Sequence, residues 1–318
     1  MVRSDAMLSK LIFGRSTDGV GTQPTIRRVT AVVNGASGSV GPDAAEAMRS
    51  LLTARDLEVT VLAPDPSEIE QAVRLAVDTA PDLLVILAGD GTARLAGQLC
   101  GPKGPLLAPL PGGTLNLLPH AIYGAVPWRE ALAAALDDGR VRNVCGGRID
   151  GHAFYCSAVL GSPALWARAR EAVRHGRLIE AWRRGAYALR RAFTGDIHYA
   201  LDGGTARAAE AVLLISPMIS KVIQEETVLE VAALEMHSAT EVFRLAFNGL
   251  VSDWRHDPGV VDEVCRKGRV WARRAIPAIL DGEVVRLENS ARFNFEPAAF
   301  RVLAPPQAQA ETQTEAAL

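Results

Sequence analysis

The chain has 318 residues, which is more than one small hydrophobic core accommodates, so we expect two domains. Hydrophobic residues make up 48% of the chain and the net charge is −2, which fits a globular protein and argues against a nucleic-acid partner. The four cysteines include no C-x-x-C pair, and no apolar run reaches the roughly 18 residues of a membrane span, so we predict free thiols, no zinc site and a cytoplasmic location.

The first part of the chain alternates strand and helix signals. Residues 1–25 are expected to form a flexible leader. Apolar strand-like runs then occur at residues 29–33, 58–62, 83–87 and 106–110, and helical patterns lie between and after them, the last one at residues 127–138. Two of these runs are continuously apolar, as in parallel strands that are covered on both faces. We therefore predict a doubly wound α/β nucleotide-binding domain over residues 26–142.

The second part reads differently. Asp150-Gly151, Asp202-Gly203 and Asp281-Gly282 are hairpin-turn signals between strand-like runs. They predict an antiparallel β-rich, sandwich-like substrate domain over residues 143–304, interrupted by one helical segment near residues 163–192. Residues 305–318, rich in Gln, Ala, Thr and Glu, are expected to form a disordered tail.

Three glycine-bearing loops follow strand ends of the first domain. They are Asn34-Gly35-Ala36-Ser37-Gly38, Ala88-Gly89-Asp90-Gly91-Thr92 and Pro111-Gly112-Gly113-Thr114-Leu115-Asn116. In open α/β sheets the ligand lies outside the carboxyl ends of the strands, and glycines let backbone N–H groups approach phosphate oxygens. Asp90 repels phosphate, so its carboxylate suits Mg²⁺ or a ribose hydroxyl. The loops match neither the dinucleotide fingerprint nor the Walker P-loop.

These three loops, with Leu280-Asp281-Gly282-Glu283 far downstream, resemble the diacylglycerol kinase catalytic-domain family, which includes bacterial lipid kinases and sphingosine kinases. The resemblance covers about residues 28–304. It implies ATP in a cleft between two domains, with the chain's end returning toward the first domain. It also implies an ATP-dependent kinase that transfers a phosphoryl group to a diacylglycerol-like or sphingoid hydroxyl.

The resemblance assigns roles residue by residue. The cofactor-binding positions that it implies for ATP are Asn34, Ser37, Gly38, Gly89, Asp90, Gly91, Thr92, Gly112, Gly113, Thr114 and Asn116. Asp90 is the expected Mg²⁺ ligand. Asp281 is implied as the general base, with Glu283 beside it in the ATP–Mg²⁺ site. The similar Asp202 turn lacks a glutamate, and we interpret it as structural.

Several positions depart from the family pattern. Ala88 replaces a glycine, Leu95 and Leu117 replace two carboxylates, and the glycine-rich stretch of the second domain is missing around residues 215–222. Two alternatives therefore stay open. One is an NAD kinase, which shares the Gly-Asp-Gly-Thr loop. The other is a nucleotide- or lipid-binding homologue without transfer activity.

A basic segment spans residues 166–193, where eight arginines alternate with aromatic and apolar residues and only two glutamates oppose them. A basic amphipathic helix can lie on an anionic membrane surface, and a solvated helix packed on the sheet is equally compatible with the pattern. The first interpretation predicts peripheral attachment at the inner membrane face. The oligomeric state, including a homodimer, is left open.

Overall fold

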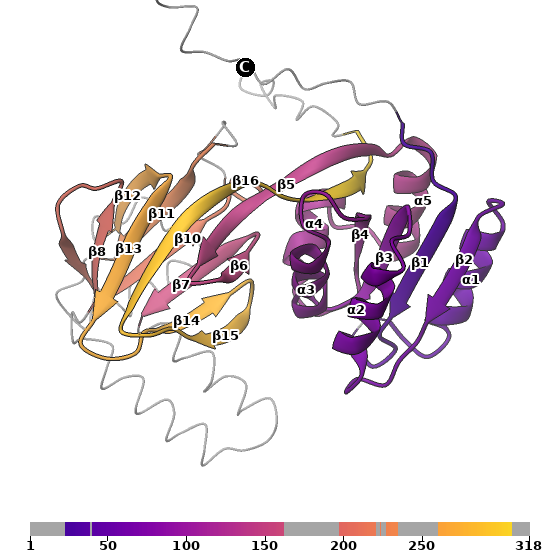
Figure 1. Cartoon of the computed structure of the whole chain (residues 1–318), viewed down its shortest axis with the longest axis horizontal. Helices are drawn as coiled ribbons and strands as arrows, with labels where there is room; N and C mark the ends of the chain where they lie inside the picture. The colour runs from indigo at the N-terminus through magenta and orange to yellow at the C-terminus, as the bar shows by residue number, and fades with distance from the viewer. Residues whose placement is uncertain are drawn as a thin grey trace, which may run out of the picture.

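The structure is a computed structural model, and it describes residues 23–38, 40–161, 197–220, 223, 227–234 and 260–306. Most of the expected leader and tail, and the whole basic segment at residues 166–193, lie outside these ranges. Figure 1 shows an α/β domain beside a β-rich domain, connected by the long strands β5 and β16.

The α/β domain is built on a parallel sheet in the order β2-β1-β3-β4. All residues of β3 and β4 are buried, as their continuously apolar sequences predict. Helices α2 and α3 pack against each other, and α1 contacts β1 and β2. The elements are β1 (Arg28–Val33), α1 (Ala44–Thr53), β2 (Glu58–Leu62), α2 (Ile69–Asp78), β3 (Leu83–Ala88), α3 (Asp90–Cys100), β4 (Leu106–Pro111), α4 (Leu117–Tyr123) and α5 (Trp128–Asp138).

The β-rich domain packs two sheets around a second hydrophobic core. One sheet has the order β12-β11-β10-β7-β14-β15, with antiparallel pairs throughout. The strands of this domain are β5 (Arg140–Ile149), β6 (His152–Phe154), β7 (Ser157–Gly161), β8 (Ile197–Leu201), β9 (Arg207–Ala209), β10 (Ala211–Ile215), β11 (Leu229–Leu234), β12 (Val260–Cys265), β13 (Lys267–Ala272), β14 (Pro277–Leu280), β15 (Glu283–Arg286) and β16 (Ser290–Ala304).

Strand β16 belongs to both domains. Its first part pairs with β13, and its end lies parallel to β4, where Val302 is the partner of Leu107. Strand β5 pairs antiparallel with β16 along most of its length, with a register shift between Glu296 and Phe300. The α/β sheet therefore continues into the β-rich domain. This arrangement confirms the predicted fold class, an α/β domain followed by an antiparallel domain.

Candidate active site

The three glycine loops meet at the carboxyl ends of β1, β3 and β4. A Cβ atom added to Gly113 would lie 2.8 Å from Gly89 Cα, and one added to Gly89 would lie 3.7 Å from Ser37 Oγ. A Cβ atom on Gly38 would lie 3.5 Å from Thr114 Oγ1. Glycine is thus required where backbone meets backbone, between Gly113 and Gly89. Gly112 is similarly close to Ala88, since its Cβ would lie 2.8 Å from the Ala88 nitrogen.

The loops present backbone donors. Gly89 is the N-cap of α3, and the N–H groups of Thr92 and Ala93 both donate to its carbonyl oxygen at 3.1 Å. Among the described residues, the N–H groups of Gly38, Gly91 and Thr114 have no protein acceptor. Free N–H groups around a helix N-terminus form an anion-binding site. The geometry therefore suits the phosphate chain of a nucleotide such as ATP.

Asn34 and Asn116 were predicted to contact the nucleotide. In the structure, their side chains form hydrogen bonds with the backbone of their own loops. Asn116 adopts a left-handed conformation with φ of 53°, and its side-chain amide exchanges two hydrogen bonds with the backbone of Gly113, at 2.7 and 3.1 Å. The Asn34 side chain accepts a hydrogen bond from the Ala36 N–H at 3.2 Å. Both amides hold glycine-rich turns in shape, which is a positioning function.

Asp90 begins α3, and its carboxylate is directed at a different helix. Oδ1 accepts a weak hydrogen bond from the Leu118 N–H at 3.4 Å, in the first turn of α4. Burial raises the pKa of Asp90, and the N–H groups of Leu118, Asn116 and Leu117 act in the opposite direction. Mg²⁺ is usually held by one or two carboxylates together with substrate phosphates. Asp90 beside the phosphate loops fits that pattern, although the described residues contain no cluster of three or more His, Cys, Asp or Glu side chains suited to a metal.

Asp281 lies on the β14–β15 turn and is 4% exposed. Its carboxylate accepts three backbone hydrogen bonds from the turn between β6 and β7. Oδ2 accepts from Tyr155 at 2.7 Å, and Oδ1 accepts from Cys156 at 2.8 Å and Ser157 at 2.9 Å. Burial raises the pKa of Asp281, while these N–H groups and the charge of Arg94 act against the increase. One acceptor position therefore remains on Oδ2.

The same turn geometry occurs three times. Asp150, Asp202 and Asp281 have φ values of 43°, 48° and 48°, and a glycine in the left-handed region follows each of them. Each aspartate binds the backbone N–H and C=O of one residue on a neighbouring strand: Arg292, Lys267 and Ser157, respectively. Asp150 and Asp202 are exposed, whereas Asp281 is buried beside the first domain. The turn itself is structural, and only its location distinguishes Asp281.

The side chain of Glu283, two residues after Asp281, contacts the first domain. A Cβ atom added to Gly91 would lie 1.6 Å from Glu283 Oε1, so the carboxylate lies directly against the first turn of α3. Glu283 Oε2 accepts a hydrogen bond from Arg94 Nη2 at 2.7 Å. On the same turn, a Cβ atom on Gly282 would lie 3.5 Å from Leu115 Cδ1. The β14–β15 turn thus contacts two of the three loops.

No motif or resemblance in the sequence singled out Arg94. Its side chain is 16% exposed, and among the described residues Nε is a buried donor without an acceptor. Arg94 lies four positions after Asp90 on α3, so the two side chains share one face of the helix. This four-residue spacing from Asp90 is the sequence signal that could have indicated Arg94 as a site residue. Leu95 and Leu117, where the family has carboxylates, are partly buried against the first hydrophobic core.

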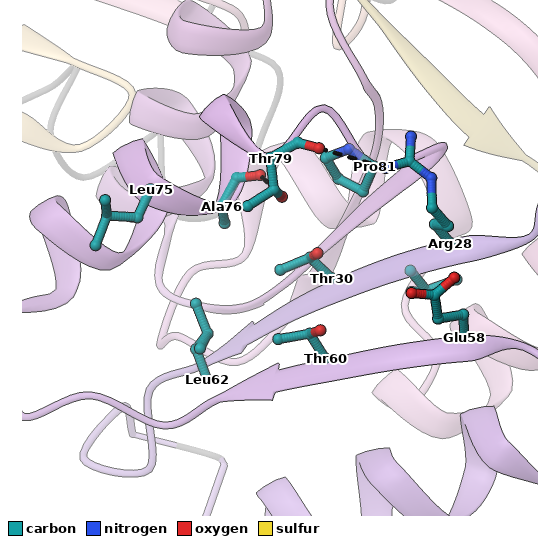
Figure 2. A pocket seen from close by; sticks show the side chains of 10 residues that line it. Arg28, Thr30, Glu58, Thr60, Leu62, Leu75, Ala76, Thr79 and Pro81 are labelled. Carbon is teal, nitrogen blue, oxygen red and sulfur yellow. Dashed lines mark hydrogen bonds between the residues drawn. The ribbon is translucent and has the colours of Figure 1, made fainter.

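A hollow of about 320 Å³ lies beside α2, away from the loops (Figure 2). Thr30 and Thr60 lie side by side on β1 and β2 within it. The Arg28 guanidinium at its edge already donates to the Ala80 carbonyl oxygen at 2.6 Å. None of the predicted site residues lines this hollow, so it adds nothing to the candidate active site.

Known proteins resemble this chain in sequence and in fold. Residues 28–149 match the diacylglycerol kinase catalytic domain. A structure of a diacylglycerol kinase from Bacillus anthracis str. Sterne has a TM-score of 0.63 and 17% sequence identity, and the match covers 89% of this chain and 98% of that one. At this identity, the likeness shows the fold. An NAD kinase from Archaeoglobus fulgidus in complex with ATP has a TM-score of 0.49 and 13% identity, with 87% and 94% coverage.

The catalytic-domain match covers the three glycine loops and ends at the start of the Asp150 turn. The chain is therefore similar to a lipid-kinase family in the domain that carries the loops. All four cysteines are buried as free thiols. In the part of the chain that the structure describes, no helix is both long and apolar enough to cross a membrane.

Proposed function

We propose that this chain is an ATP-dependent lipid kinase that transfers the γ-phosphoryl group to a lipid hydroxyl, with Asp281 as the general base. One observation supports this assignment above the others. Of the three similar aspartate turns, the one that carries Asp281 is buried against the phosphate loops, with Glu283 on Gly91 and Gly282 beside Leu115. A carboxyl group with a raised pKa in such a position is a candidate proton acceptor.

In the proposed step the γ-phosphoryl group moves from ATP to the lipid. The lipid hydroxyl oxygen forms a bond to the γ-phosphorus, the bond from that phosphorus to the β–γ bridging oxygen breaks, and ADP leaves with the electron pair. The hydroxyl proton passes to Asp281 Oδ2, the oxygen that accepts only one backbone hydrogen bond. The N–H groups of Tyr155, Cys156 and Ser157 hold the carboxylate fixed during this transfer.

The first domain would supply the groups that compensate the negative charge of the phosphates. The N-terminal turn of α3 and the N–H groups of the glycine loops would bind phosphate oxygens. Asp90 would hold Mg²⁺, which neutralises charge on the β- and γ-phosphates when bound. Arg94 supplies a positive charge at the β14–β15 turn, where it donates a hydrogen bond to Glu283 at 2.7 Å, and this charge lowers the pKa of Asp281. Leu95 and Leu117 stand where the family has carboxylates, so this chain has fewer possible metal ligands. We infer that the positive charge of Arg94 compensates for the metal charge that those ligands would hold.

The test compares two matched variants. Asp281→Asn should lower the yield of phosphorylated lipid from labelled ATP and a lipid extract by about 10²- to 10⁴-fold, because the proton acceptor is lost. ATP binding should persist. Asp202→Asn is the control, since Asp202 has the same turn and the same type of backbone hydrogen bonds at an exposed position. It should keep full activity. Mass identification of the product names the lipid.

Other outcomes separate the alternatives. A phosphorylated product from NAD but from no lipid would identify an NAD kinase. ATP binding without product across a broad lipid panel would contradict turnover and support a binding protein. Equal activity of the Asp281→Asn protein and its parent would show that the carboxylate is only a turn-forming group, as at Asp202.

A further inference from the structure

A cluster of basic residues on β13 has no part in the active site described above. Residues 266–274, Arg-Lys-Gly-Arg-Val-Trp-Ala-Arg-Arg, contain five basic side chains and no acidic one, although the whole chain has a net charge of −2. In the sequence it is separate from the arginines at residues 166–193. Its middle part forms β13, which lies between β16 and β8 in the larger sheet.

The alternation of β13 places its charges on one face. Val270 is fully buried in the second core, so Lys267, Arg269 and Trp271 lie on the opposite face of the sheet. The register adds His198 from β8, opposite Trp271, and Arg292 from β16, opposite Arg269. We call this surface the basic sheet face; it comprises His198, Lys267, Arg269, Trp271 and Arg292. Four of these five are exposed, and Trp271 is half-buried.

Among the described residues, the basic side chains of this face form no ion pairs, although the Asp150 and Asp202 carboxylates bind the backbone N–H groups of Arg292 and Lys267. Arg269 lies directly opposite Arg292, and like charges at paired positions of adjacent strands are destabilising. None of Lys267, Arg269 and Arg292 forms an ion pair with another described residue. By contrast, Arg148 pairs with Glu296 through two hydrogen bonds, at 2.6 and 3.1 Å. The positive charge that is left without an ion pair suits an anionic partner.

Trp271 contacts two of the other residues of this face. The rings of Trp271 and His198 are stacked, with centroids 5.7 Å apart and an interplanar angle of 18°. The Arg269 Cζ atom lies 5.4 Å from the centre of the Trp271 ring, and Arg269 Nε donates to Ser290 Oγ at 2.9 Å. Basic side chains around a tryptophan are typical of surfaces at the membrane–water interface.

We propose that the basic sheet face docks the protein on an anionic lipid bilayer. The positive charges are spread across β13 and β16, which suits an extended anionic surface better than a single small ligand. The choice of a bilayer over a nucleic acid rests on the proposed function, because an enzyme that acts on a lipid hydroxyl must reach the membrane. The docking itself needs neither ATP nor turnover.

The experiment uses the full chain without ATP. It is sedimented with vesicles of phosphatidylcholine alone and of phosphatidylcholine mixed with phosphatidylserine. Binding is expected only to the mixed vesicles and should weaken as salt is added. The variant Arg269→Gln/Arg292→Gln should bind roughly 30-fold more weakly, from the loss of two charges near the surface. Its melting temperature should equal or exceed that of the parent, because the facing charges are gone.

The control variant Lys103→Gln/Arg129→Gln removes the same charge from exposed positions of the first domain and should bind like the parent. Equal binding of the Arg269→Gln/Arg292→Gln variant and the parent would overturn the proposal and direct attention to residues 166–193. Retention on duplex DNA without vesicle binding would also overturn it. Vesicle binding without any phosphorylated product would support docking while contradicting the kinase, so the two failures are distinguishable.

Discussion

At the scale of single residues, the ion pair between Arg94 and Glu283 changes the role expected for the glutamate. The resemblance implied Glu283 as a residue of the ATP–Mg²⁺ site, but its carboxylate binds a guanidinium from the other domain at 2.7 Å. A carboxylate engaged in a charged hydrogen bond is less available to a metal. We therefore infer that Glu283 acts through Arg94, as a positioning residue for that cation.

This inference predicts non-additive effects of substitution. Arg94→Gln should lower kcat/KM on the order of 10²-fold, by analogy with the loss of one preorganised donor to a developing charge. Glu283→Gln should cost less, because Arg94 stays in place. The double variant should be no worse than Arg94→Gln alone. The measurement is kcat/KM for ATP at several Mg²⁺ concentrations; additive losses with a shifted Mg²⁺ dependence would instead make Glu283 a metal ligand.

The raised pKa of Asp281 predicts a pH dependence. A general base must be ionised, so kcat/KM should rise with pH through the pKa of Asp281, which lies above the ordinary aspartate value of 3.8 because of burial. The charge of Arg94 lowers this pKa. Arg94→Gln should therefore move the acidic side of the plot of kcat/KM against pH to higher pH, and Arg94→Lys should return it toward the position found for the parent. If the acidic side of this plot were unchanged in Arg94→Gln, the titration would belong to another group.

At the scale of elements, the glycine loops depend on close backbone contact. Gly113 and Gly91 would both place a Cβ atom too near a neighbour, but the neighbours differ. At Gly113 the neighbour is the backbone Cα of Gly89, and at Gly91 it is the end of the half-exposed Glu283 side chain. A backbone atom cannot rotate away, whereas a carboxylate can.

Gly113→Ala should therefore separate the second and third loops and weaken ATP binding, with a loss of stability of about 1–3 kcal/mol from overpacking. Gly91→Ala should cost little stability but displace Glu283 from Arg94. Gly35→Ala is the control, because its Cβ would meet only the Gly41 carbonyl oxygen at 3.7 Å. Calorimetric titration with ATP and thermal melts measure both effects. Equal ATP affinity of Gly113→Ala and Gly35→Ala would contradict phosphate binding by these loops.

The loops and strands were predictable from local sequence because their signals are local. Continuous apolar runs mark the buried β3 and β4, and Asp-Gly pairs mark the turns. The contacts of Asp281 and Glu283 were not predictable, since their partners Tyr155 and Arg94 lie 126 and 189 residues away in the chain, respectively. The position of Glu283 on Gly91 depends on how two domains meet, and no periodic pattern encodes that contact.

At the scale of the whole molecule, β16 makes the two domains interdependent. Its first part completes the second core with Phe293, and its end completes the first core with Phe300 and Val302. The resemblance implied that the chain's end returns toward the first domain, and β16 lies beside β4 there. Because one strand is shared by both cores, the domains are expected to unfold in a single cooperative transition.

Phe300 is the residue at which this coupling can be tested. It is fully buried, its ring meets that of Tyr155 edge-on with centroids 4.7 Å apart, and Gly97 of α3 leaves room for it. Phe300→Ala should destabilise the protein by about 3–5 kcal/mol, since it leaves a cavity between α3 and the turn that binds Asp281. Calorimetry should show one transition at a lower temperature, and amide exchange should increase at Tyr155 and in α3 together. Two separate transitions, with only one of them shifted, would show that the domains fold independently and that β16 does not couple the loops to Asp281.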